Sequence, residues 1–249
     1  MTYEIIADFD GTLTRKSEGC DSSFDVLRDA LPEQTRKISE EIYQQYAPLE
    51  FDFSLSLEKR NEYMEEWWNK EFEITIAGGL TLDMIHSAGN SERLVFRENV
   101  RELFLFAHEQ QIPLLVFTAG IANIIDIKLE KEGLYFPNVQ VVGNRFLFDT
   151  EGKAVAYTKP VVYVGNKHLI AQSFVDKIHH DIVFLLGDHP TDANMCHDDN
   201  HTKVIRFGFL NEKNNDNGSY SRYNYLYKEK DSSVEGVLMF IRKEKEENK

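Results

Sequence analysis

The sequence is poor in cysteine and contains no long hydrophobic run. Two cysteines in 249 residues, Cys20 and Cys196, exclude a disulfide framework and suit a reducing compartment. The longest apolar runs, such as Ile112–Phe117 and Ile182–Leu186, have the length of buried strands and are far shorter than a membrane span. Aspartates interrupt the only apolar stretch near the N-terminus, so no signal peptide is recognisable there. We therefore expect a cytoplasmic protein without membrane contact.

Positive charge is also scarce. The chain has 28 Lys and Arg residues against 42 Asp and Glu residues, which gives a formal net charge of −14. A surface that binds a nucleic-acid polymer needs clustered Lys and Arg side chains that displace counterions, so we expect no such partner. A small anionic ligand remains compatible with this charge, because a pocket that holds a metal ion is locally positive.

Short apolar runs alternate with helical patterns along most of the chain. Tyr3–Phe9 is rich in β-forming residues and ends before Gly11, which predicts a buried strand followed by a loop. The elements expected further along are strands at Leu114–Thr118, Val139–Val142, Ile182–Gly187 and Lys203–Arg206, helices near Ile121–Glu132 and Leu169–Ile178, and a hairpin of Arg145–Phe148 with Ala154–Thr158. The alternation predicts an α/β fold, a doubly wound parallel sheet of the Rossmann-like kind, with its functional edge at the strand C-termini.

The segment between the first two strands has a different pattern. Hydrophobic residues recur there at helical spacing, as Phe24, Leu27 and Leu31 do. We therefore expect a core domain of residues 1–15 and 91–249 and an inserted helical cap domain of residues 16–90. A polar loop is expected at Asn211–Ser221.

Two aspartates, Asp8 and Asp10, stand where the first strand ends, in the motif DFDGTLT. Two carboxylates about 4 Å apart repel each other by roughly 4 kcal/mol at an effective dielectric of 20. A divalent cation relieves that repulsion, and the hard oxygen ligands favour Mg²⁺. The alternative is a turn with an Asx cap, because Asp-Gly is common in turns.

A second acidic pair follows a later strand. Asp188 comes directly after Gly187, and Asp192 lies four residues further on. Taken alone, Asp188 could be a helix N-cap with Asp192 in the first turn. Because the carboxyl ends of parallel strands meet at one edge of a sheet, the two acidic pairs together predict a single magnesium site.

Two further segments provide groups that suit a phosphate. Thr118-Ala119-Gly120 separates a strand from a helix, where backbone N–H groups at a helix N-terminus bind anions. Lys167 opens another helix and supplies a cation for a phosphoryl oxygen. The alternatives are a simple N-cap at Thr118 and a solvated surface lysine.

The chain resembles the haloacid-dehalogenase (HAD) superfamily over the whole core. The resemblance rests on four features in this order: DxDGTxT, a hydroxyl after the second strand, a lysine and GDxxxD. The resemblance implies a phosphoaspartyl mechanism. Asp8 would attack phosphorus, and Asp10 would protonate the leaving alkoxide and later activate water. The resemblance assigns the other roles as follows: phosphate binding to Thr118, Ala119, Gly120 and Lys167, magnesium ligation to Asp8, Asp188 and the carbonyl of Asp10, and orientation of the ligands to Asp192.

From residue 5 to the last helix the chain is similar to the eukaryotic pyrimidine 5'-nucleotidase family, also called cytosolic 5'-nucleotidase III. The similar segments are YMEEWW (63–68), FTAGI (117–121), PNVQVV (137–142), NKH (166–168) and GFLNE (208–212). The resemblance implies that Glu66 accepts hydrogen bonds from the base and that Trp67 or Trp68 offers a stacking surface. The alternatives are a solvated acid and a tryptophan in the cap core.

The sequence departs from that family at several positions. Gly11 stands where the family usually has Met, Thr118 where it has Ser, and His-Pro-Thr (189–191) where it has Ser-x-Gly. The stretch between Thr14 and Phe24 has no obvious match. The charged groups of the mechanism are nevertheless all present, so these departures affect the choice of base more than the chemistry.

The leading hypothesis is a magnesium-dependent phosphatase of nucleoside 5'-monophosphates, pyrimidine ones first. The alternatives are a phosphatase of another small phosphomonoester, such as 7-methylguanosine monophosphate, a phosphoamine or a sugar phosphate, and a non-catalytic binding protein on the same scaffold. A monomer or a weak homodimer is expected.

Overall fold

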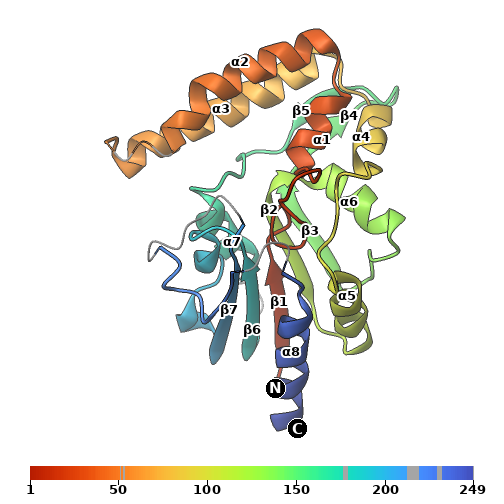
Figure 1. Cartoon of the computed structure of the whole chain (residues 1–249). Coiled ribbons are helices and arrows are strands. Elements are labelled where there is room, and N and C mark those ends of the chain that lie inside the picture. Colours follow the sequence, from red (N-terminus) through yellow and green to blue (C-terminus); the bar gives the residue numbers. More distant parts are fainter. Residues whose placement is uncertain (51, 53, 176–178, 212–218, 229–231, 249) are drawn as a thin grey trace.

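The computed structural model describes the chain except for residues 51, 53, 176–178, 212–218, 229–231 and 249. Its centre is a six-stranded parallel sheet in the order β3-β2-β1-β6-β7-β8 (Figure 1). The strands are β1 (Tyr3–Ala7), β2 (Leu114–Ile121), β3 (Val139–Asn144), β6 (Ile182–Gly187), β7 (Lys203–Phe209) and β8 (Tyr225–Tyr227). The predicted α/β fold with a parallel sheet is confirmed.

Side chains of the central strands alternate between two apolar layers, as strand geometry requires. Ile5 and Ala7 of β1 belong to one hydrophobic cluster, and Ile6 belongs to the other. The elements that pack on the Ile5 side are α5 (Val100–Glu109), α6 (Ala122–Lys131) and α8 (Glu235–Glu247); those on the Ile6 side are α7 (Lys167–Val175) and the 3₁₀ helix η1 (Asp192–Asn194). This three-layer arrangement leaves the ends of the sheet for the connecting loops.

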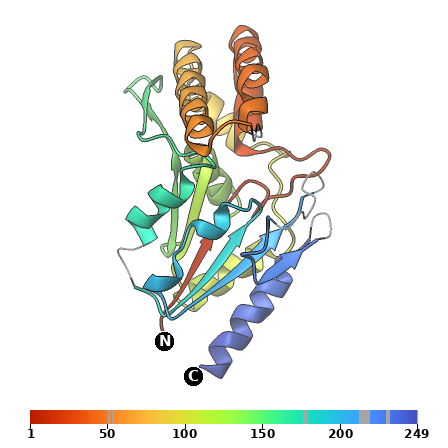
Figure 2. The same ribbon diagram turned by 90° about the vertical axis from the view of Figure 1, so that its left-hand side faces the viewer.

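A pair of long helices lies beyond the C-terminal edge of the sheet, at the end of the molecule opposite to both termini (Figure 2). The helical elements in this region are α1 (Ser23–Ala30), α2 (Glu33–Glu50), α3 (Leu57–Ala77) and α4 (Leu82–Gly89). Near its start, α3 meets the core, because the side chain of Asn61 lies against Gly165. The helix pair therefore approaches the segment that leads into α7.

The hairpin of β4 (Phe146–Phe148) and β5 (Ala154–Tyr157) packs on α3, although it lies within the predicted core range of residues 91–249. The ring of Phe72 lies 5.1 Å from that of Phe146 and 5.0 Å from that of Tyr157. The hydroxyl of Tyr157 also donates a hydrogen bond to Asn69 (2.8 Å). The exact division into core and cap stays a prediction, and the hairpin is in contact with the helices of the predicted cap.

Several predicted boundaries differ from the structure by a few residues. Strand β2 continues to Ile121, α7 begins at Lys167, and β7 continues to Phe209. Strand β8, only three residues long, was not anticipated. Most of the predicted polar loop and residues 176–178 of a predicted helix lie outside the described residues.

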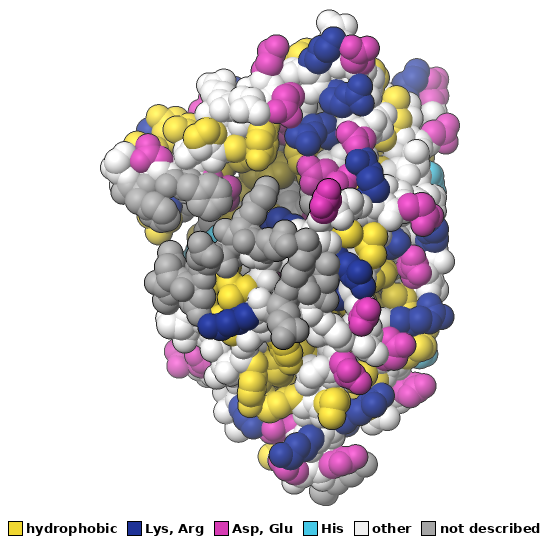
Figure 3. Space-filling view, viewed as in Figure 1, with side chains coloured by type: hydrophobic (Ala, Val, Ile, Leu, Met, Phe, Trp, Pro, Cys, Tyr) yellow, Lys and Arg dark blue, Asp and Glu magenta, His cyan; other side chains and the backbone are white. Residues whose placement is uncertain are grey.

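Lys and Arg side chains are interspersed with Asp and Glu over the face seen in Figure 3. The described part of that face shows no broad basic area. Among the described helices, none has both the length and the apolar character needed to cross a membrane.

Candidate active site

Three buried carboxylates meet at the C-terminal edge of β1 and β6. Asp8 follows β1, Asp188 follows β6, and Asp192 opens η1. The two strands are paired directly, with Ala7 opposite Leu186. One oxygen from each of the three carboxylates lies within 4.8 Å of the others. The structure therefore brings Asp8 together with the second acidic pair, which begins 180 residues further along the sequence.

Lys167 joins this group from the first turn of α7. Its ammonium nitrogen donates to Oδ1 of Asp8 and, at 2.9 Å, to Oδ1 of Asp192. The other oxygen of Asp192 accepts from the backbone N–H groups of Asp188 (3.2 Å) and His189 (3.0 Å). Only 2% of Lys167 is exposed, so this is not the solvated surface lysine of the alternative interpretation.

Burial dominates the electrostatics of the cluster. It raises the pKa of Asp8 from its ordinary value of 3.8 to about 7, although the charge of Lys167 opposes the shift. Burial also raises the pKa of Asp188. Desolvation disfavours the charged form of Lys167, but the carboxylates of Asp192 and Asp8 outweigh it and raise its pKa. Three carboxyl groups thus lie close to one buried ammonium group, and burial favours the protonated forms of Asp8 and Asp188.

Asp10 is bound by Ser23 and is not one of the three clustered acids. Its Oδ1 accepts from the backbone N–H of Ser23 (2.7 Å), and its Oδ2 accepts from the Ser23 hydroxyl (2.6 Å). Burial raises the pKa of Asp10 to about 6, and the two bonds from Ser23 oppose that shift. The carboxyl group is therefore held separately from the Asp8–Asp188–Asp192 cluster. The predicted metal contact of Asp10 involves its backbone carbonyl and stays a prediction.

Thr118, Ala119 and Gly120 lie in the last part of β2, just before α6 begins. The hydroxyl of Thr118 is buried and accepts from the N–H of Gly120 at 2.9 Å. The carbonyl of Ala119 accepts from Asn144 of β3 at 2.7 Å. The predicted phosphate segment is thus on the same sheet edge as the acids, although the N–H of Gly120 already has a partner within the protein.

Two buried residues that support the site through hydrogen bonds, Arg97 and Asn211, were not predicted as site residues. Arg97 donates to the carbonyls of Thr12 (3.0 Å) and Gly11 (2.8 Å), and also to Oδ1 of Asn211 (2.8 Å). The amide of Asn211 then donates to Oδ2 of Asp188 at 2.8 Å. Asn211 follows β7 shortly after its C-terminus, the same placement that identified Asp8 and Asp188, so this signal was available in the sequence.

The comparisons with known proteins agree with this geometry. The family model of the pyrimidine 5'-nucleotidases (UMPH-1) matches residues 11–243. The chain belongs to the pyrimidine 5'-nucleotidase family. The prediction of a HAD-type hydrolase of phosphoric monoesters is therefore confirmed.

Curated relatives and solved structures extend the likeness over nearly the whole chain. A 7-methylguanosine phosphate-specific 5'-nucleotidase of Gallus gallus is 26% identical, over 96% of this chain and 87% of the relative. One of Drosophila melanogaster is 29% identical, over 83% and 68% of the two chains. The crystal structure of cytosolic 5'-nucleotidase IIIB bound to cytidine superposes with a TM-score of 0.78, at 24% identity, over 95% and 83% of the chains. At 14% identity, a phosphoserine phosphatase (TM-score 0.61; 96% and 99% covered) shares the fold.

The two residues predicted to contact the base have different environments. Glu66 lies on the exposed side of α3, where it accepts from Tyr46 (2.8 Å) and Lys70 (2.7 Å). Trp67 is only 6% exposed. The rings of Tyr46 and Trp68 stack against its ring, with ring centroids 6.4 Å and 5.5 Å away. Trp67 thus occupies the position of the core alternative, because neighbouring rings already contact it.

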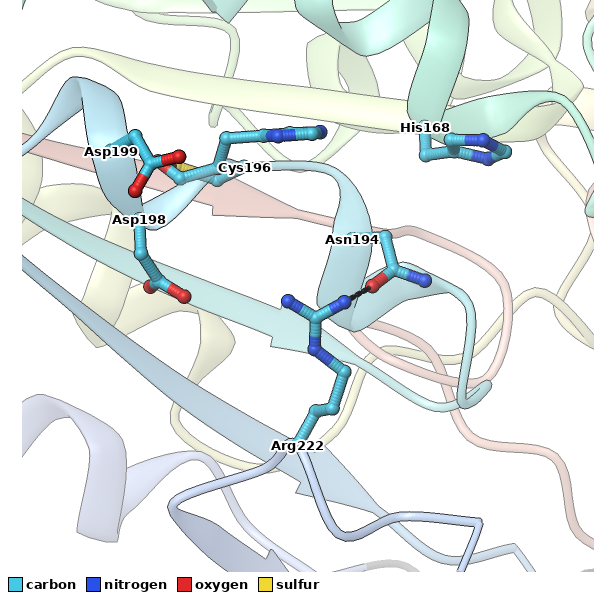
Figure 4. A pocket seen from close by; sticks show the side chains of 7 residues that line it. His168, Asn194, Cys196, Asp198, Asp199 and Arg222 are labelled. Carbon is cyan, nitrogen blue, oxygen red and sulfur yellow. Dashed lines mark hydrogen bonds between the residues drawn. The ribbon is translucent and has the colours of Figure 1, made fainter.

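A cavity of about 320 Å³ is lined by Asn194 of η1, by Arg222 and by the segment Cys196–Asp199 (Figure 4). Arg222 donates a hydrogen bond to Asn194 there, and His168, near the start of α7, also lines the cavity. None of the predicted catalytic residues lines this cavity. The candidate active site of the enzyme is therefore defined by its side chains and not by this cavity.

Proposed function

We propose that the enzyme hydrolyses nucleoside 5'-monophosphates with Mg²⁺, through a phosphoaspartyl intermediate on Asp8. The observation that carries this proposal is the buried cluster of Asp8, Asp188, Asp192 and Lys167 at the sheet edge that faces the helix pair. Phosphate-monoester hydrolysis is so slow unaided that enzymes accelerate it by up to about 10²¹-fold. A nucleophile, a fixed cation and a proton donor in one buried place are what that acceleration requires.

The donor set fits a magnesium ion. Three buried carboxylates face the single positive charge of Lys167, and the more exposed ammonium of Lys16 approaches Asp188 only to 3.7 Å. Hard oxygen donors with excess negative charge suit Mg²⁺. We propose that Asp8, Asp188 and the carbonyl of Asp10 hold it, with Asp192 orienting the group. When bound, the ion would neutralise charge between Asp8 and the phosphoryl oxygens.

The protein's own groups account for the proton and bond changes. An oxygen of Asp8 forms a bond to phosphorus while the bond to the ester oxygen breaks, and Asp10 gives its proton to that oxygen. Lys167 and the Thr118–Gly120 segment hold the phosphoryl oxygens. In the second step Asp10 accepts a proton from water, the water oxygen bonds to phosphorus, and the carboxylate of Asp8 leaves.

Support for a nucleotide as the substrate comes from the relatives. Their names specify 7-methylguanosine phosphate, the family is named for pyrimidine nucleotides, and the solved relative holds cytidine. We therefore propose pyrimidine and 7-methylguanosine 5'-monophosphates as the first substrates to test. Glu66 is the proposed base contact from α3, with its carboxylate already oriented by Lys70. We also propose that the enzyme acts in the cytoplasm.

The deciding experiment is a panel of phosphate esters assayed with Mg²⁺ and with a chelator. The panel contains the pyrimidine, purine and 7-methylguanosine 5'-monophosphates, phosphoserine, a sugar phosphate and 4-nitrophenyl phosphate. Selective hydrolysis of nucleotides that the chelator abolishes is the expected result. Preference for phosphoserine or the sugar phosphate would contradict the proposed substrate class, and an active Asp8→Asn variant would contradict the mechanism.

A further inference from the structure

Ser23 lies at a junction between three parts of the site. It is the first residue of α1, it is fully buried, and both its backbone N–H and its hydroxyl bind the carboxyl group of Asp10. The same hydroxyl oxygen accepts from the N–H of Ile121, at the end of β2 (3.1 Å). One side chain thus connects the proposed proton donor, the strand that carries the phosphate segment and the first helix after the nucleophile loop.

These contacts fix the direction of the hydrogen bonds. Because the Ser23 oxygen accepts from Ile121, its own proton is available for Oδ2 of Asp10. The backbone N–H of Ser23 donates to the other oxygen, Oδ1. Both oxygens of Asp10 therefore accept bonds from one residue, and the carboxyl group cannot rotate without breaking one of them.

The neighbouring backbone is shaped around this pair. A side chain at Gly120 would overlap both the hydroxyl oxygen of Ser23 and Oδ2 of Asp10. Gly120 is thus required for Ser23 and Asp10 to approach β2. A glycine is needed at this position of the phosphate segment because the side chains of Asp10 and Ser23 fill the space that a side chain would occupy.

We propose that Ser23 is a positioning residue that holds Asp10 in the orientation needed to protonate the leaving oxygen. This inference rests on the proposed function, in which Asp10 is the general acid. A general acid works only when its proton lies within hydrogen-bond reach of the leaving oxygen, so its orientation contributes directly to the rate. Because Ser23 belongs to α1, the alignment of Asp10 depends on that helix being docked against the core.

The test compares two leaving groups. A nucleoside alkoxide must be protonated as it leaves, whereas 4-nitrophenolate leaves without a proton. The value of kcat/KM reports the steps up to the first irreversible one, so hydrolysis of the phosphoaspartate does not enter the comparison. A residue that only supports the fold would affect both substrates equally.

We expect Ser23→Ala to lower kcat/KM for the best nucleotide of the panel by roughly tenfold or more, because it removes the bond at Oδ2 and keeps the bond at Oδ1. The value for 4-nitrophenyl phosphate should fall by less than about threefold, which also shows that the variant is folded. Asp10→Asn sets the scale, with an expected loss of about 10²–10⁴-fold on the nucleotide. In the Asp10→Asn background, Ser23→Ala should cause no further loss.

Ser22→Ala is the matched control. Ser22 caps α1 by accepting from the N–H of Asp25 (3.2 Å) and does not bind Asp10. Its loss weakens the same helix but should leave the ratio of the two kcat/KM values unchanged.

Equal losses on both substrates in Ser23→Ala, or no loss on either, would overturn the role of Ser23 while the proposed function stands. If Asp10→Asn itself shows no dependence on the leaving group, the acid role in the proposed function fails, and the role of Ser23 fails with it.

Discussion

The guanidinium of Arg97 donates a hydrogen bond to Oδ1 of Asn211, at 2.8 Å. This bond orients the amide of Asn211 so that its nitrogen faces Oδ2 of Asp188. Through its bonds to the carbonyls of Gly11 and Thr12, Arg97 also holds the turn that follows Asp8. Arg97 therefore connects the loop after β1 with the loop after β7. Asn211, in the loop after β7, orients Asp188, a proposed metal ligand.

Arg97→Met should destabilise the protein by roughly 3–5 kcal/mol, because it leaves the buried carbonyl of Thr12 and Oδ1 of Asn211 without this donor. It should also weaken Mg²⁺ binding by about 10–100-fold, as the loss of groups that orient metal ligands does in other proteins. Urea unfolding measures the first effect and calorimetric titration with Mg²⁺ measures the second. Arg101→Met on the exposed face of α5 is the control. Unchanged Mg²⁺ affinity in a folded Arg97→Met variant would contradict the coupling to Asp188.

The parts of this site that the sequence predicted share one physical basis. Asp8 and Asp188 follow apolar strands, and in a parallel sheet the strand ends meet at one edge whatever their separation in sequence. Lys167 and the Thr118–Gly120 segment were found because each lies at a junction with a helix.

Ser23 and Arg97 could not be found in this way. They reach the site from loops and from a helix N-terminus, and such positions are set by the packing of whole elements. No motif is recognisable in the sequence between Thr14 and Phe24. The surroundings of Trp67 could not be predicted either, because helical spacing does not tell which side of α3 faces the aromatic core. The three-residue strand β8 carries too little sequence for any periodicity to predict it.

Gly120→Ala should abolish nucleotide hydrolysis and destabilise the protein by roughly 1–3 kcal/mol, because it overpacks a buried site. The added methyl group would overlap Ser23 and Asp10, so the two side chains must separate or β2 must shift. The measurement is kcat/KM together with thermal unfolding. Gly79→Ala is a suitable comparison, since Gly79 has a φ of +83° but open space around it. That variant should lose about 1 kcal/mol of stability and keep its activity. Full activity in Gly120→Ala would show that the site tolerates a displaced Asp10.

Glu4 gives the protein a pH-dependent stability that is independent of the active site. It is the second residue of β1, it is buried, and its Oε2 has no hydrogen-bond partner. Burial raises the pKa of Glu4 from 4.5 to about 7. Well below pH 4.5 the side chain is neutral in both states, and its ionisation does not affect stability. Between pH 4.5 and 7 the unfolded chain releases the proton that the folded protein keeps, so stability falls as pH rises and then levels off.

Glu4→Gln should therefore be more stable than the parent protein at pH 8, by roughly 1–3 kcal/mol, with the difference shrinking towards pH 5. Urea unfolding at a series of pH values measures this difference. Glu73→Gln, on the exposed side of α3, is the control and should follow the parent curve. If the difference between Glu4→Gln and the parent does not change with pH, Glu4 does not titrate in this range.

Glu66 and Glu65 are adjacent exposed acids on α3, and only one of them is expected to contact the base. The carboxylate of Glu66 is fixed by Tyr46 and Lys70, and their hydrogen bonds lower its pKa, which keeps it an acceptor near neutral pH. Glu66→Ala should raise KM for the preferred nucleotide by about tenfold, the effect of losing one charged hydrogen bond. Turnover of 4-nitrophenyl phosphate, which has no base, should stay the same, as should both activities in Glu65→Ala. An equal loss on both substrates in Glu66→Ala would mean that Glu66 supports α3 rather than selecting the base, and selection would then have to come from other residues of the helix pair.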